Sequence, residues 1–286
     1  MQLVWSQTIP NPLRGLCLAR ERETVLVWDG QEGLFLFNHA GMIQARRPFP
    51  SPIAAAGCAE DGSAYAIGGS QTPMVCWLAP DLALRWQHPL PQRATAVAVE
   101  PLGQFVAVAD AGCTLRLMDA RGRTLWQATT PRALHHLAFV PEKPILVGAA
   151  DFGLVVCFGA KGECLWRDGL VAHVGSLAVS GEGSSVLLAC FSDGLYRYST
   201  GGPKPQRIPL EPACRLASLS YSGDTLLTVD RQDCASMRDS KGDLRDRLSL
   251  DSPAVSLRLG ALADYAIVGL ASGVIRRFDL RPSSAD

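Results

Sequence analysis

Residues 104–131 read QFVAVADAGCTLRLMDARGRTLWQATTP and contain three short apolar runs separated by clusters of small and polar residues. The clusters ADAG and DARG are typical of tight turns between antiparallel strands. The run TLRLMD alternates apolar and polar residues, and an alternation with a period of two predicts a strand, whereas a helix would need a period of 3.6. We therefore expect this stretch to form three neighbouring strands of one antiparallel sheet.

The same pattern recurs along the chain at a spacing of 40 or 41 residues, with central runs that begin at residues 24, 64, 104, 144, 185, 225 and 265. Another apolar run precedes each central run by about ten residues, a third run follows it, and a fourth run ends six of the seven repeats. One sheet of four short strands cannot bury both of its faces, but repeats stacked around an axis can. The repeats predict an all-β fold, a seven-bladed β-propeller of four-stranded antiparallel blades.

The seventh repeat has no fourth run after it, and the stretch LVWSQTIP at Leu3–Pro10 is a strand with no partner nearby in the sequence. Trp5 stands at the same point of its run as Trp86, Trp126 and Trp166 do in theirs. We therefore predict that the N-terminal strand completes the last blade and closes the ring. The prediction is a single domain, 1–286, with blades at roughly 12–50, 51–91, 92–131, 132–171, 172–211, 212–250, and 251–280 plus 2–10.

Composition and charge argue against several classes of partner. The chain has 27 basic and 27 acidic residues, whereas proteins that bind nucleic acid or anionic membranes usually carry a basic excess. No apolar run approaches 18 residues, so no membrane insertion is expected. The first residues lack the features of a signal peptide, and the nine cysteines are scattered without a C-x-x-C pair, which predicts reduced thiols and a cytoplasmic location.

Two known families share features with these repeats. Residues 172–199, AHVGSLAVSGEGSSVLLACFSDGLYRYS, resemble a WD repeat, with His173 at the place of the family's histidine and Ala172 in place of its glycine. The segments MDARGRTLW and FGAKGECLW resemble the repeats of pyrroloquinoline-quinone-like propellers, although the spacing from Asp119 to Trp126 is one residue shorter than in that family. The resemblance covers essentially the whole chain and implies a propeller fold. The second family also implies quinone-dependent oxidation with a calcium ion.

The four phased tryptophans, Trp5, Trp86, Trp126 and Trp166, could stack on a cofactor or pack between blades. A binding site needs a tryptophan at one place, whereas packing copies it from repeat to repeat. A tryptophan on an outer strand can cover a large area of blade-to-blade contact. We therefore predict that they dock neighbouring blades.

The histidines and turn aspartates do not suggest a metal site. His135 and His136 are adjacent on a predicted first strand, so their side chains should point to opposite faces and cannot share one ion. His173 is expected to make a structural hydrogen bond between strands. Asp151, Asp193 and Asp233 lie at predicted turns between second and third strands, where they either form an acidic ring or cap their own turns; we expect capping. No catalytic motif occurs, and we expect no catalytic residue, no metal and no cofactor.

One set of polar residues suggests a binding surface. Basic residues stand where first strands begin in four repeats, and two aspartates stand in turns that should lie on the same face of a propeller. These residues are Arg14, Arg93, Arg132, His173, Asp151 and Asp193. Ordinary loop polarity is the alternative explanation.

From these features we predict a non-enzymatic interaction module that binds a protein or peptide on this face, either as a monomer or as a subunit of a larger complex. A quinone- or metal-dependent oxidoreductase is one alternative. A propeller that binds a small molecule, including a hydrolase or lyase, is the other.

Overall fold

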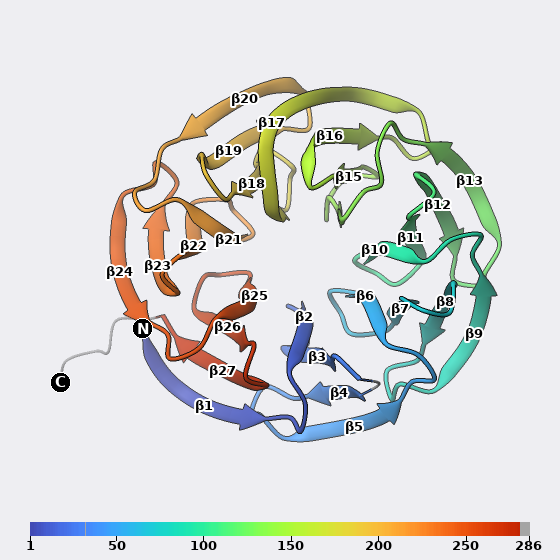
Figure 1. Cartoon of the computed structure of the whole chain (residues 1–286), viewed down its shortest axis with the longest axis horizontal. Helices are drawn as coiled ribbons and strands as arrows, with labels where there is room; N and C mark the ends of the chain where they lie inside the picture. The colour runs from blue at the N-terminus through green and yellow to red at the C-terminus, as the bar shows by residue number, and fades with distance from the viewer. Residues whose placement is uncertain (32, 281–286) are drawn as a thin grey trace.

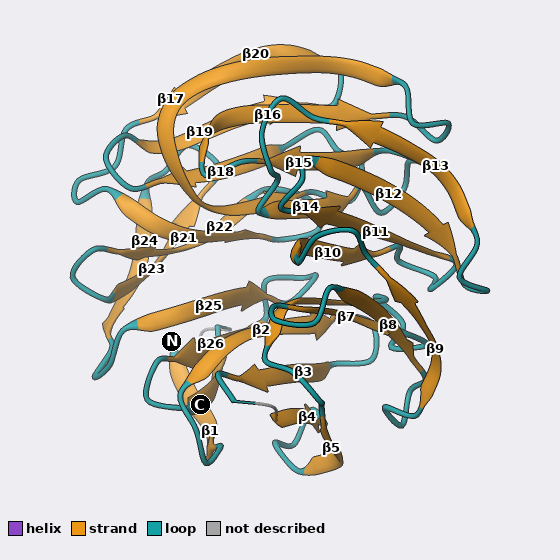
Figure 2. Cartoon of the chain, turned by 45° about the vertical axis from the view of Figure 1, so that its right-hand side comes forward, coloured by secondary structure: helices purple, strands orange, loops and turns teal. Residues whose placement is uncertain are grey.

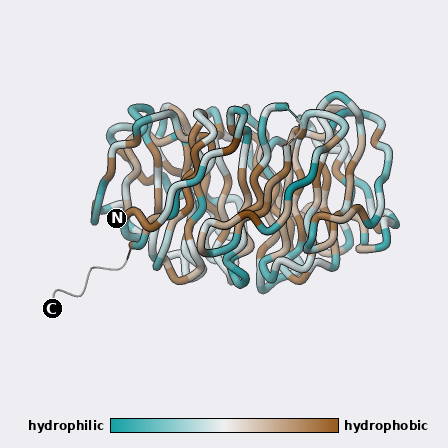
Figure 3. Tube along the Cα trace, turned by 90° about the horizontal axis from the view of Figure 1, so that it is seen from below, coloured by the Kyte–Doolittle hydropathy of each residue, from teal (hydrophilic) through white to brown (hydrophobic). Residues whose placement is uncertain are grey.

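The computed structural model describes residues 1–31 and 33–280, and its 27 strands form six antiparallel sheets. Five sheets have four strands and one has seven. The sheets stand around a central space with their first strands innermost and their fourth strands outermost (Figure 1). Seen from the side, the molecule is flat, and hydrophobic segments lie at mid-height between two more hydrophilic faces (Figure 3). The all-β prediction is confirmed.

The first three sheets each contain four consecutive strands. The first sheet comprises β2 (Leu13–Ala19), β3 (Thr24–Asp29), β4 (Gly33–Phe37) and β5 (Ile43–Pro48). The second comprises β6 (Ile53–Cys58), β7 (Tyr65–Gly69), β8 (Met74–Leu78) and β9 (Leu84–Pro89). The third comprises β10 (Ala94–Val99), β11 (Phe105–Asp110), β12 (Thr114–Asp119) and β13 (Thr124–Thr129).

The remaining strands form a sheet of seven strands and two sheets of four. The larger sheet comprises β14 (His136–Phe139), β15 (Leu146–Ala149), β16 (Phe152–Phe158), β17 (Cys164–Val179), β18 (Val186–Cys190), β19 (Gly194–Ser199) and β20 (Gly202–Ile208). The next comprises β21 (Cys214–Leu219), β22 (Thr225–Asp230), β23 (Cys234–Asp239) and β24 (Leu244–Ser249). The last comprises β25 (Ala254–Leu259), β26 (Tyr265–Leu270), β27 (Val274–Asp279) and β1 (Gln2–Thr8).

The seven-stranded sheet exists because β17 does not break. Its first part pairs with β16 and its last part with β18, so one strand of 16 residues spans the place where the sequence predicted two strands. Proline interrupts the other junctions between fourth and first strands, as at Pro10, Pro50, Pro91, Pro131 and Pro253. Residues 164–179 contain no proline. Because proline lacks the N–H that a strand ladder needs, its absence lets the strand continue through this junction (Figure 2).

The N-terminal strand pairs with the last strand of the chain. β1 runs antiparallel to β27, with Leu3 opposite Phe278 and Thr8 opposite Val274. The Ile9 N–H continues the ladder by donating to the Gly273 carbonyl oxygen at 2.9 Å. A strand at the start of the chain therefore becomes the outermost strand of the last sheet.

The core lies between neighbouring sheets. The second and third strands are buried along nearly their whole length, as in β3 and β7, because a sheet covers each of their faces. Outer strands such as β5 and β13 alternate exposed and half-buried residues. One cluster joins Leu26 and Leu36 of the first sheet to Tyr65 and Ile67 of the second.

The four phased tryptophans make one repeated contact at the outer rim. Trp5, Trp86 and Trp126 contact the following sheet, and Trp166 contacts the β19–β20 part of its own seven-stranded sheet. Each Nε1–H donates to a carbonyl oxygen 34 residues later, at 2.9–3.0 Å. The pairs are Trp5 with His39, Trp86 with Ala120, Trp126 with Ala160, and Trp166 with Thr200. Three of the rings also stack on an aromatic ring next to the carbonyl group that they contact: Trp5 on Phe37, Trp126 on Phe158 and Trp166 on Tyr198. The Trp86 ring instead stacks on Trp77 of its own sheet.

Candidate functional site

One face of the molecule, the entry face, carries the loops before the first strands and the turns between second and third strands. Backbone hydrogen bonds join these two sets of loops. Gly30 donates to the carbonyl oxygen of Pro12 at 3.0 Å, and Ser70 donates to that of Pro52 at 2.9 Å. The loops are therefore held as a rigid rim around the central space.

A repeated β-bulge shapes this rim. In the pairing of β2 with β3 the register shifts between Leu13 and Gly15, and five other first strands show the same shift near their start. A bulge leaves one residue out of the ladder and re-aims its side chain. In β2 that residue is Arg14, which is exposed and lines the mouth of the central space.

Three of the predicted site residues meet around Phe152, the first residue of β16. Arg132 donates from Nη1 to the Phe152 carbonyl oxygen at 3.0 Å. The His173 ring packs edge-on against the Phe152 ring with 4.1 Å between centroids. Asp151 precedes Phe152 directly, and its carbonyl oxygen accepts the Val174 N–H at 3.1 Å. The expected interstrand hydrogen bond of His173 is wrong, because its imidazole is exposed and packs on an aromatic ring.

Two exposed aromatic residues complete this region, which we call the aromatic patch: Arg132, Asp151, Phe152, His173 and Phe191. Phe152 is 59% exposed and Phe191 is 40% exposed. The Phe191 N–H donates to the His173 carbonyl oxygen at 3.1 Å, which places the two residues side by side. The sequence prediction missed both phenylalanines. The available signal was a phenylalanine inside the turns AADFG and CFSDG, where small or polar residues are usual.

The other predicted residues lie elsewhere on the entry face. Arg93 precedes β10 and is exposed, and its carbonyl oxygen accepts the Ala111 N–H at 3.0 Å. Asp193 faces outward along the rim, where Arg207 donates from Nε to its carbonyl oxygen at 3.0 Å and approaches its carboxylate at 3.8 Å. The structure therefore brings Arg132, Asp151 and His173 together and leaves Asp193 in a separate ion pair.

The predicted capping role of the turn aspartates is wrong. The Asp151 carboxylate faces two histidines, and the Asp233 carboxylate accepts the Ala254 N–H at 3.1 Å from the next sheet. The capping carboxylates are instead buried at the ends of second strands. They are Asp29, Asp110 and Asp230, each of which accepts the N–H groups two and four residues later. This earlier position lets one carboxylate oxygen reach both N–H groups of the turn.

His135 and His136 do not point to opposite sides as the sequence suggested. His135 precedes β14 and so is outside the regular strand. As a result both rings approach Asp151, with His135 Nδ1 at 3.6 Å and His136 Nε2 at 3.8 Å from its carboxylate oxygens. His136 Nε2 also lies 3.3 Å from the Val174 carbonyl oxygen. Burial lowers the pKa of His136, and the Asp151 charge only partly opposes this effect.

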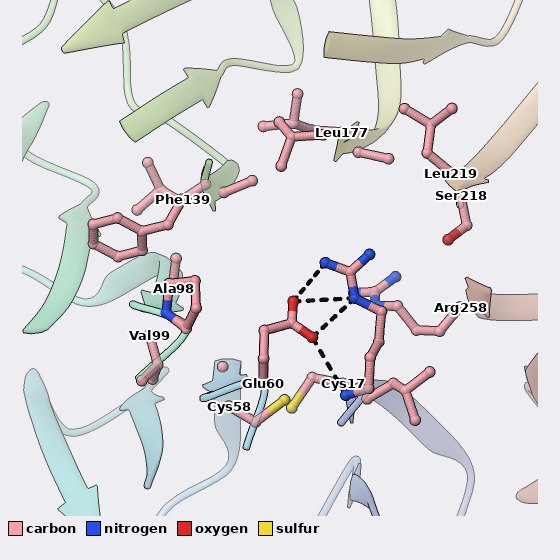
Figure 4. A pocket seen from close by; sticks show the side chains of 18 of the residues that line it. Cys17, Cys58, Glu60, Ala98, Val99, Phe139, Leu177, Ser218, Leu219 and Arg258 are labelled. Carbon is pink, nitrogen blue, oxygen red and sulfur yellow. Dashed lines mark hydrogen bonds and ion pairs between the residues drawn. The ribbon is translucent and has the colours of Figure 1, made fainter. Parts of the chain in front are cut away.

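A second recess lies toward the opposite face, which we call the exit face and which carries the turns between first and second strands. Figure 4 shows the residues that line this recess. Side chains from the first strand of every repeat line this exit recess, which has a volume of about 190 Å³. Val99, Phe139, Leu177 and Leu219 are among its apolar lining residues, beside polar and charged ones.

Three charged side chains line the exit recess: Arg20, Glu60 and Arg258. Arg20 donates two hydrogen bonds to the Glu60 carboxylate, from Nε to Oε2 at 2.8 Å and from Nη2 to Oε1 at 2.6 Å. Cys17 and Cys58 lie side by side below this pair (Figure 4). The hydrogen bond with Cys17 and burial raise the pKa of the Cys58 thiol well above its ordinary value. Cys58 is therefore a neutral thiol at neutral pH.

Within residues 1–31 and 33–280, no group of three or more His, Cys, Asp and Glu side chains is arranged to hold a metal ion. The same part of the chain contains no helix that is long and apolar enough to cross a membrane. A scan of protein-family models and a search of curated proteins found no match to the chain.

Proposed function

We propose that this chain is a closed seven-bladed β-propeller, related to the WD-repeat and quinone-like propellers, that binds a protein or peptide on its entry face without catalysing a reaction. The exposed aromatic patch carries this proposal. The partner is expected to place an apolar side chain against Phe152 and Phe191 and an acidic side chain near the arginines.

Strand pairing supports the blade count and the closure. Counting β17 once with β16 and once with β18 divides the seven-stranded sheet into two groups of four. With the five four-stranded sheets these groups make seven. The pairing of β1 with β27 then supplies the fourth strand of the last blade, so that each of the seven groups has four strands.

The make-up of the aromatic patch supports the choice of a partner. Binding energy at protein interfaces is concentrated in a few aromatic and arginine side chains near the centre of a buried area. Phe152 and Phe191 are held against β17, so binding requires little further ordering of their side chains. Arg132, together with the exposed Arg93 and Arg14 elsewhere on the entry face, favours an acidic segment over a basic one.

Affinity capture from cells that express the protein tests this function. Immobilised wild-type protein is compared with Phe152→Ser, Phe191→Ser and the charge reversals Arg93→Glu and Arg132→Glu, and the captured proteins are identified. Loss of one aromatic side chain should reduce the affinity for a genuine partner about 30-fold, because such side chains contribute about 2 kcal/mol or more to binding.

Two exposed leucines on the exit face provide matched controls. Leu102 is 59% exposed and Leu262 is 84% exposed, so Leu102→Ser and Leu262→Ser remove similar apolar area far from the aromatic patch. A partner that all four entry-face variants retain would contradict the proposal. A partner lost only from the leucine variants would place the interface on the other face.

The oxidoreductase and small-molecule alternatives stay predictions from the sequence. Pyrroloquinoline quinone with calcium can be added to the protein, followed by equilibrium dialysis and a dye-reduction assay. Quinone binding together with dye reduction would replace the interaction proposal with the enzymatic one.

A further inference from the structure

Arg258 is a charged side chain in the middle of the central space. It lies on β25, and it lines both the exit recess and the entry-side recess, the part of the central space that Arg14 also lines. The side chain lines the exit recess (Figure 4), which Arg20 also lines. Its described hydrogen bond runs from Nη1 to the Leu257 carbonyl oxygen, at 2.7 Å.

The local charges do not balance. The Glu60 carboxylate is already held by Arg20 through paired hydrogen bonds, and this pair is close to neutral. Among the residues that the structure describes, no carboxylate forms an ion pair with Arg258. Burial lowers the pKa of Arg258, yet a guanidinium stays charged in a protein. The exit recess therefore carries one positive charge in excess.

A second hydrogen-bond donor faces the same recess. Ser218 on β21 is 7% exposed, and its Oγ accepts the Leu259 N–H at 3.0 Å. The hydroxyl hydrogen remains available to donate, because that backbone bond uses only a lone pair of the oxygen. Ser218 and Arg258 both appear at the wall of the recess in Figure 4.

We propose that the exit recess binds a small organic carboxylate, whose oxygens accept hydrogen bonds from the Arg258 guanidinium and the Ser218 hydroxyl. A guanidinium presents parallel N–H groups that match a carboxylate in a bidentate pair. The apolar walls formed by Phe139, Leu177 and Leu219 accommodate the hydrocarbon part of such a ligand. The volume of about 190 Å³ is below the roughly 300–1,000 Å³ of sites for drug-sized ligands, so the ligand is small.

This site is independent of the proposed partner surface. Its residues lie on β14, β17, β21 and β25 toward the exit face, and none of them belongs to the aromatic patch. Partner capture can therefore fail while carboxylate binding succeeds, and the reverse also holds.

Isothermal titration calorimetry with acetate, butyrate, hexanoate, benzoate and inorganic phosphate tests the site. The wild-type protein should bind the carboxylates, more tightly as the apolar part grows, and should bind phosphate more weakly than benzoate. Arg258→Met should reduce benzoate affinity at least tenfold, because methionine fills similar space without a charge. Arg258→Lys should retain weak binding, since it keeps the charge but not the planar fork.

Two serines provide a matched pair. Ser218→Ala should weaken benzoate binding roughly tenfold, as expected for one hydrogen bond to a charged ligand. Ser176→Ala should leave it unchanged, because the Ser176 hydroxyl already donates to the Ala217 carbonyl oxygen at 3.4 Å and accepts the Ala217 N–H at 2.8 Å.

Thermal unfolding without ligand separates a binding role of Arg258 from a structural one. Arg258→Met should unfold at the same temperature as the wild type or higher, because removing an unbalanced, half-buried charge relieves its desolvation cost. Benzoate binding that survives in Arg258→Met would overturn the proposal. So would a wild type that binds phosphate and none of the carboxylates, or a folded wild type that binds none of the five anions.

Discussion

Gly162 and Trp126 show how one residue without a side chain makes room for the largest one. Gly162 has φ +81°, in the left-handed region, and a Cβ added there would lie 2.7 Å from the Trp126 ring. Gly41 and Gly122 occupy the same position over Trp5 and Trp86, each 36 residues after its tryptophan. The turn glycine and the docking tryptophan are thus one structural unit.

Gly162→Ala is therefore expected to destabilise the protein by about 2–3 kcal/mol, from backbone strain together with displacement of the indole. Chemical denaturation followed by tryptophan fluorescence measures the change. Gly202→Ala is the control, because Gly202 lies 36 residues after Trp166 but a Cβ there would meet nothing within 4 Å. If both variants lost the same free energy of unfolding, the contact between Gly162 and the indole would not be the cause of the destabilisation.

β14 contains a half-buried histidine that contacts two neighbouring elements. It is only four residues long, and His136 at its start contacts both the β15–β16 turn, through Asp151, and β17, through the Val174 carbonyl oxygen. Burial lowers the pKa of His136. The folded protein therefore takes up a proton at this site less readily than the unfolded chain does.

This difference predicts that acid weakens the structure around β14. As pH falls below about 6.5, the unfolded chain gains a proton on His136 before the folded chain does, so the free energy of unfolding decreases; above that pH the effect is absent. In urea denaturation, the free energy of unfolding should decrease less between pH 7.5 and pH 5.5 for His136→Gln than for the wild type. His39→Gln, at an exposed histidine, should behave as the wild type does. An unchanged acid loss in His136→Gln would contradict this assignment.

At the scale of the whole molecule, both ends of the chain enter one sheet. β1 covers β27 along its length, and Trp5 reaches from β1 to the first sheet, where it contacts Phe37 and His39. In the proposed closed ring, removing β1 opens an edge of the last blade and breaks its contact with the first.

Deletion of residues 1–8 is expected to lower the thermal unfolding midpoint by about 10 °C or more, since several kcal/mol of packing and hydrogen bonding are lost. Differential scanning calorimetry measures the shift. The control is Val4→Ser, because Val4 is 55% exposed and lies in the β-bulge between Leu3 and Trp5. If the truncated protein unfolds at the same temperature as the full chain, closure does not depend on β1.

The sequence by itself determined the strand class, the period of the repeats and the unusual origin of the last outer strand. These properties depend on local alternation, on turn residues and on the phase of Trp5, all of which can be read along the chain. The sequence-based prediction failed where a side chain that could bond within its own turn instead contacts residues distant in the sequence. Asp151 has the sequence of a turn cap, but two histidines that are close only in space draw its carboxylate away.

Only the tertiary structure decided which side chains meet. Phe152 and Phe191 each contact His173 of β17, Phe152 through its ring and Phe191 through its backbone N–H, and no spacing in the sequence encodes these contacts. Arg258 is one of many arginines in the sequence, and its unbalanced charge becomes evident once Arg20 is seen to hold Glu60. Strand periodicity is a local property of backbone and side chains, whereas desolvation and charge balance depend on neighbours contributed by the whole ring.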